Sequence, residues 1–164
     1  AAKTGKIVNI KKGQFLAPEA MSHIVAKVKE TTKAHGLQEQ AWLTERGFCF
    51  GYGDLLVDMR SFPLLASYNC PVIFDITHST QKPPASQGQT VSLADRKMAP
   101  VLARAAAASG YLDGFFLEVH PDPSKALSDK AAQLNVLQAT KLLKPLLSIW
   151  KQARDWKQDD NLFS

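Results

Sequence analysis

The chain has 164 residues, of which 45% are hydrophobic and 21% charged, and this predicts one globular domain with a sizeable core. No apolar run reaches the roughly 20 residues that span a bilayer, and the N-terminus lacks the apolar stretch of a secretory signal. The net charge is +5, because 20 basic residues, scattered along the chain, exceed 15 acidic ones. Scattered cations argue against nucleic-acid binding and favour small anionic ligands. Two cysteines, Cys49 and Cys70, are too few for a disulfide framework, so we expect reduced thiols in the cytoplasm.

Four short runs of apolar, β-branched or aromatic residues recur along the chain, at residues 7–10, 41–44, 72–76 and 114–117. Their spacing of roughly 30 to 40 residues fits strand-plus-helix units rather than hairpins. The runs are continuous rather than alternating, which is typical of strands buried on both faces. The sequence therefore predicts an α/β protein with a parallel sheet, in which four β/α units make about half of a (β/α)₈ barrel.

Helical patterns lie between these strands. The first has Pro18 near its start, Gly36 as its stop, and an apolar stripe of Met21, Ile24, Val25 and Val28. The second surrounds Pro63, which either opens or breaks a helix. The third is capped by Asp95 and runs to Gly110, and the fourth covers residues 134–156 with an expected kink or reset at Pro145.

Turn-forming residues without an apolar period fill residues 82–92. A linker between domains would look similar, but the strand–helix pattern continues on both sides. We expect a mobile loop over a site instead.

Polar residues follow each predicted strand directly. They are Lys11 and Lys12 after the first, Glu45 and Arg46 after the second, Asp75, His78 and Gln81 after the third, and Glu118, His120 and Asp122 after the fourth. In a parallel barrel all these strand ends open onto one face, where active sites form. Taken singly, Lys11 and Lys12 could be a solvated pair, Glu45 and Arg46 a structural ion pair, and His78 a histidine of the rim. His23 and His35 have no neighbouring acid cluster and are not assigned to a site.

A histidine and two carboxylates, His78, Glu118 and Asp129, come from separate loops of this face and suit a divalent transition metal. His120 and Asp122 are alternatives for the same role. Lys11 and Arg46 together imply a substrate with at least two negative charges. The chain has no glycine-rich phosphate loop and no nucleophile elbow, so neither a nucleotide cofactor nor acyl-serine chemistry is expected.

Several motifs in order carry a resemblance to a known family. They are NIKKGQF (9–15), TERG (44–47) with FGY (50–52), LVDMR (56–60), FDITHSTQ (74–81), EVHPDP (118–123) and KALSD (125–129). Together they resemble the 3-deoxy-D-manno-octulosonate 8-phosphate synthase family from Gly5 to about Leu134. The resemblance implies that residues 1–157 are the C-terminal half of a single (β/α)₈ barrel, with 158–164 as a flexible tail.

The resemblance also implies an activity. Members of the family condense phosphoenolpyruvate with D-arabinose 5-phosphate, release phosphate and serve lipopolysaccharide synthesis. By motif, Lys11 and Arg46 would bind phosphoenolpyruvate, and Gln81 and Asp122 would contact substrate. His78, Lys11 and Asp75 would be the catalytic residues, and His78, Glu118 and Asp129 would bind iron, zinc or manganese.

Three alternatives stay open. The family has a metal-independent branch, although Gln133-Leu134 after Asp129 resembles the metal-dependent one. A related 3-deoxy-D-arabino-heptulosonate 7-phosphate synthase would use a four-carbon aldehyde instead. The chain could also be a half-barrel that binds phosphorylated ligands or self-associates without catalysis. The resemblance further implies a cytoplasmic homo-oligomer, with a tetramer as the expected form. It also implies an N-terminal half of the barrel, without which this chain can be inactive.

Overall fold

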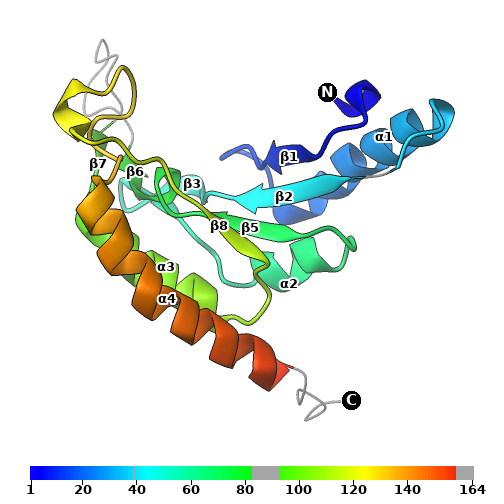
Figure 1. Cartoon of the computed structure of the whole chain (residues 1–164). Helices are drawn as coiled ribbons and strands as arrows, with labels where there is room; N and C mark the ends of the chain where they lie inside the picture. The colour runs from blue at the N-terminus through cyan, green and yellow to red at the C-terminus, as the bar shows by residue number, and fades with distance from the viewer. Residues whose placement is uncertain (39, 83–92, 158–164) are drawn as a thin grey trace.

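A four-stranded parallel sheet is the centre of the protein, which a computed structural model describes over residues 1–38, 40–82 and 93–157 (Figure 1). Its strands are β1 (Val8–Lys11), β2 (Ala41–Glu45), β5 (Val72–Asp75) and β8 (Gly114–Phe116), in the order β1-β2-β5-β8. All three neighbouring pairs are parallel. The four predicted strands and their parallel arrangement are thereby confirmed.

Burial follows the position of each strand in the sheet. The central strand β5 is buried at every residue, and β2 is buried at all but Trp42. The outer strands β1 and β8 are mostly half-buried, because each has only one neighbour in the sheet. An open sheet with two unpaired edges is the form that half of a barrel takes on its own.

The main helices alternate with these strands. They are α1 (Met21–Ala34), α2 (Ser61–Ala66), α3 (Ala99–Ala108) and α4 (Val136–Lys157). Pro18 opens the short 3₁₀ turn before α1, and Gly36, with a φ of +63°, follows its end. The side chain of Asp95 accepts from the backbone N–H of Lys97, as an N-cap does, one turn before α3. Helix α4 continues through Pro145 as one element.

Two short antiparallel ribbons lie beside the main sheet and were not expected from the sequence. The strands β3 (Phe48–Gly51) and β4 (Asp54–Leu56) form a hairpin. Its two-residue turn has Tyr52 at φ +57° and Gly53 at φ +81°, the left-handed geometry of a type I′ turn. The second ribbon pairs β6 (Gln81–Lys82) with β7 (Leu93–Ala94).

The predicted mobile loop at 82–92 falls almost wholly on residues 83–92, and the predicted tail on 158–164. Both stretches lie outside the described residues.

The hydrophobic core lies between the sheet and the helices. Helix α1 contributes Met21, Val25 and Val28 at the spacing of one helical face. The rings of Phe62 from α2 and Phe74 from β5 meet edge to face, with centroids 5.8 Å apart, and both are fully buried. Among the described helices, none combines the length and the apolar character needed to cross a membrane.

Candidate active site

The carboxyl ends of the strands meet at one edge of the sheet (Figure 1). The register places Lys11 of β1 opposite Thr44 of β2, and the last residue of β5, Asp75, opposite Phe116 of β8. Parallel neighbours are about 4.8 Å apart. The polar residues that follow the four strands are therefore close to one another although they are up to a hundred residues apart in sequence.

Asp75 organises the first part of this edge. One of its carboxylate oxygens lies 2.7 Å from the Lys11 ammonium and 2.8 Å from His78 Nδ1. The other accepts the backbone N–H of His78 at 2.9 Å. Burial of Asp75 alone would raise its pKa, but the bonds from His78 and the pairing with Lys11 hold this pKa below its usual value. The aspartate is thus a fixed anion that orients both the lysine and the histidine.

His78 turns its other ring nitrogen toward two carboxylates. Nε2 is 3.5 Å from Glu118 Oε1 and 3.9 Å from Asp129 Oδ2. One ligand atom from each of these three residues lies within 4.8 Å of the others. With Nδ1 bonded to Asp75, Nε2 is the nitrogen available to a metal, and a carboxylate–histidine pair of this kind is the common outer support of metal sites. The residues predicted as metal ligands come together and fit a divalent cation.

Arg46 is linked through Gln81 to Asp129, one of the three residues that could hold a metal ion. Its guanidinium donates to Gln81 Oε1, and the Gln81 amide donates to Asp129 Oδ1 at 2.9 Å. The Arg46 Nε–H is buried and has no hydrogen-bond partner among the residues that the structure describes. An unpaired buried donor is costly unless a ligand satisfies it. The unsatisfied donor therefore favours an anionic ligand beside Arg46.

Below Arg46 lies a buried ion pair. Lys12 and Glu45 are both fully buried, and Lys12 Nζ is 3.5 Å from Glu45 Oε1. The same ammonium donates to the carbonyls of Gly13, Leu16 and Gly47. Burial lowers the pKa of Lys12 and raises the pKa of Glu45. The partner of Glu45 in the structure is therefore Lys12 rather than Arg46. The Arg46 guanidinium bonds to Gln81 instead.

Three residues, Thr77, Gln133 and Phe116, support the site through contacts that were not predicted from the sequence. The hydroxyl of Thr77 accepts the backbone N–H of Glu118 at 2.8 Å. The Gln133 amide donates to Glu118 Oε2 at 3.4 Å and to the carbonyl of Ser128 at 3.0 Å. The Lys11 ammonium lies 4.3 Å from the ring centre of Phe116. These contacts depend on how the strands and the loops after them lie next to one another in the fold. The spacing of residues in the sequence does not reveal that arrangement.

Two polar residues of the predicted face make contacts within their own loop. Asp122 caps the turn Pro123–Lys125 through the N–H of Ser124 and pairs with Lys125 at 3.4 Å. His120 Nδ1 accepts the backbone N–H of Asp122 at 3.0 Å. Neither belongs to the group of three side chains, among the described residues, that could hold a metal ion. The role of Asp122 in substrate binding stays a prediction.

The parallel sheet, with cations, a histidine and carboxylates at its carboxyl edge, defines the class. It is part of an α/β barrel whose strand ends carry cations beside three residues that could hold a metal ion. Residues 1–155 match the DAHP synthetase I family, and the chain belongs to that family.

Curated relatives share a more specific name, 2-dehydro-3-deoxyphosphooctonate aldolase. The protein of Trichlorobacter lovleyi is 50% identical over 149 residues, which cover 91% of this chain and 52% of the relative. The protein of Koribacter versatilis is 49% identical over 150 residues, covering 91% of this chain and 51% of the relative. That of Desulfotalea psychrophila is 44% identical over 149 residues, 91% of this chain and 50% of the relative. The chain spans about half the length of the relatives it matches.

Proposed function

We propose that this chain is the C-terminal half of a 3-deoxy-D-manno-octulosonate 8-phosphate synthase and acts within a complete (β/α)₈ barrel. The reaction joins C3 of phosphoenolpyruvate to the aldehyde carbon of D-arabinose 5-phosphate, adds water at C2 and releases phosphate. The observation that carries the proposal is the convergence of Lys11, Arg46 and the three metal-ligating residues at one sheet edge. The name shared by the relatives supports the choice of substrates.

Lys11 and Arg46 would bind phosphoenolpyruvate. Lys11 is one-third exposed and held by Asp75, so its ammonium is both accessible and fixed in place. Arg46 offers a planar fork whose Nε–H is unsatisfied. Cations that are already oriented can neutralise and position an anionic substrate without being reorganised during the reaction. Gln81 bonds to Arg46 and would keep the guanidinium aligned with the metal-binding side.

His78, Glu118 and Asp129 would hold a divalent transition metal such as iron, zinc or manganese, which supplies Lewis-acid assistance to water or to the aldehyde oxygen when bound. Asp75 lies 2.8 Å from His78 Nδ1 and fixes the orientation of the ring, so that an Nδ1–H donated to Asp75 would leave the Nε2 lone pair for the metal. Gln133 holds Glu118 from the other side. Loss of activity in a chelator, with recovery on adding one of these metals, would support the metal-dependent branch.

The half-sheet itself supports assembly. Within the described residues, strands β1 and β8 each have one unpaired side, and unpaired sheet edges favour association with a second half-barrel. We propose that the complete barrel forms a homo-oligomer, a tetramer by family resemblance, and that it works in the cytoplasm, where its phosphorylated substrates are made.

The test is a complete barrel in which the N-terminal half of the Trichlorobacter lovleyi relative precedes Ala1. Circular dichroism would first establish that the chimaera folds. Phosphate release from phosphoenolpyruvate should then be fast with D-arabinose 5-phosphate and slow with D-erythrose 4-phosphate. Preference for the four-carbon aldehyde would identify a heptulosonate synthase instead. A folded, metal-loaded chimaera that turns over neither aldehyde would favour a non-catalytic, ligand-binding half-barrel.

A further inference from the structure

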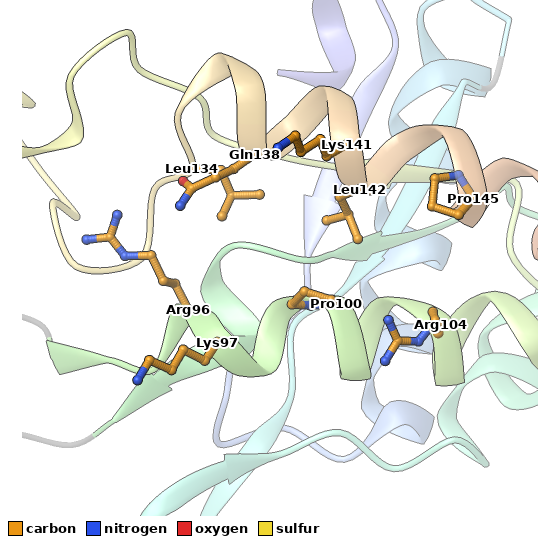
Figure 2. Close-up of a pocket in the computed structure, with 9 residues that line it drawn as sticks. All are labelled: Arg96, Lys97, Pro100, Arg104, Leu134, Gln138, Lys141, Leu142 and Pro145. Carbon is orange, nitrogen blue, oxygen red and sulfur yellow. The ribbon is translucent and has the colours of Figure 1, made fainter.

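A groove lies between α3 and α4 (Figure 2). None of its lining residues is one of the side chains described at the catalytic edge, although Arg96 and Leu134 hydrogen-bond to the loops that carry that edge. The groove has a volume of about 390 Å³. Four of its nine lining residues are cations, and none is acidic: Arg96, Lys97, Arg104 and Lys141. The cations come from both sides of the groove, because Lys141 belongs to α4 and the others to α3 and the turn before it.

The positive charge of the groove is not neutralised within the described part of the chain. Lys97, Arg104 and Lys141 form no ion pair with any described acid. Like charges gathered around one cavity repel one another and raise the local concentration of anions. A ligand with two negative charges would relieve this repulsion, and the arginine fork matches the geometry of a phosphate or carboxylate group.

The groove also has an apolar floor. Pro100 of α3 and Leu142 and Pro145 of α4 line it, together with Leu134. In Figure 2 the Leu142 side chain lies between the two helices, near Pro100. A wholly inorganic anion would leave this surface wet, whereas a hydrocarbon or ring would cover it. No aromatic residue lines the groove, so it lacks the stacking surfaces on which single-stranded nucleic acids bind.

One cation of the groove, Arg96, is already held in place by hydrogen bonds. The Arg96 guanidinium donates to the carbonyls of Gln133 and Lys130, both at 3.2 Å. These bonds fix the guanidinium at the groove and tie it to the turn that begins at Asp129. A charge held in this way loses little side-chain entropy when a ligand binds.

We propose that the groove between α3 and α4 is a binding site for a small organic dianion, in which a phosphate or a pair of carboxylates is attached to a short hydrocarbon or a ring. The charged groups meet Arg104, Lys141 and their neighbours, and the apolar part lies on the prolines and leucines. This site is separate from the carboxyl edge of the sheet and does not depend on the function proposed above.

Phenyl phosphate is a suitable probe, with inorganic phosphate as the charge-only comparison and benzyl alcohol as the ring-only comparison. Each is titrated into the ¹⁵N-labelled 164-residue chain, and dissociation constants are taken only from backbone signals of α3 and α4. Phenyl phosphate should bind at least fivefold more tightly than either comparison. Signals near Lys11 and Arg46 report any binding at the catalytic edge separately.

The variant Arg104→Ala/Lys141→Ala removes two exposed charges and leaves Arg96 and its turn intact. The dissociation constant of phenyl phosphate should rise about two- to fivefold for each exposed charge removed, which is about 4- to 25-fold for the double variant. The matched control Lys144→Ala/Lys151→Ala removes two exposed charges from α4 outside the groove. It should change the dissociation constant of phenyl phosphate by less than twofold. The proposal is overturned if phenyl phosphate binds no better than either comparison, if the two double variants weaken it equally, or if only signals of the catalytic edge move.

Discussion

Asp75→Asn tests how the catalytic edge is organised. The substitution keeps the shape of the side chain and removes its charge. In the wild-type protein this carboxylate is fully buried and accepts three donors, from the His78 backbone, the His78 ring and Lys11. Asparagine is uncharged and can accept at one oxygen only, so the His78 ring loses its anionic partner and Lys11 loses its ion pair. We expect the metal affinity of the His78 site to fall.

The expected size follows from these contacts. Loss of an outer carboxylate behind a metal-binding histidine lowers metal affinity by about 10- to 100-fold. Stability should also fall, by about 2–3 kcal/mol in the free energy of unfolding. A fully buried pair would cost more, but Lys11 is one-third exposed and water screens its charge.

Isothermal titration of the chain with Zn²⁺ and Mn²⁺ measures the affinity, and urea denaturation measures the stability. Asp58→Asn is the matched control, because Asp58 also pairs with a cation at 2.7 Å, the exposed Arg60, but has no contact with His78. The control should bind metal with wild-type affinity. If Asp75→Asn also stays within twofold of the wild-type affinity, the orienting role of Asp75 is refuted.

Three further outcomes are expected. In the complete barrel, Arg46→Ala should raise the KM for phosphoenolpyruvate about 10- to 100-fold, as loss of a charge-assisted hydrogen bond would, and an unchanged KM would remove Arg46 from the site. In urea denaturation, Lys12→Met should lower the unfolding free energy by about 3–5 kcal/mol, because it leaves Glu45 buried and unpaired. The double variant Lys12→Met/Glu45→Gln should recover part of this loss. If the effects of the two substitutions on the unfolding free energy simply add, the two residues are not coupled. Because the folded-state pKa of Asp75 is lowered, its charge stabilises the fold above about pH 4 and this contribution is lost as pH falls further. The stability gap between wild type and Asp75→Asn should thus narrow in acid, and a gap that stays constant down to pH 2 would argue against a lowered pKa.

The strands were predictable because each is a continuous apolar run, and burial on both faces of a parallel sheet demands such runs. The β3–β4 hairpin was not predictable in the same way. Its turn places Tyr52 at φ +57°, a conformation that tyrosine seldom adopts, so the usual asparagine–glycine signal is missing. The apolar Leu55 and Leu56 that follow gave the appearance of a run leading into α2.

For the site, the residue types were predictable and the partners were not. Lys11 and Lys12 are adjacent in sequence and look alike. On consecutive positions of extended chain they point to opposite sides. Lys11 reaches Asp75 at the edge, and Lys12 is buried against Glu45. The registers of β1 with β2 and of β2 with β5 decide which lysine meets which acid, and register is a property of the folded sheet.

The central claim is that the sheet edge brings His78, Glu118 and Asp129 together as one metal site, and X-ray absorption spectroscopy of the metal-loaded chain tests it most directly. We predict one transition-metal ion per chain with a single imidazole and carboxylate oxygens at about 2.0–2.2 Å. The imidazole signal should disappear in His78→Ala and persist in the control His120→Ala. Absence of a bound ion, or an imidazole signal that survives His78→Ala, would contradict the account.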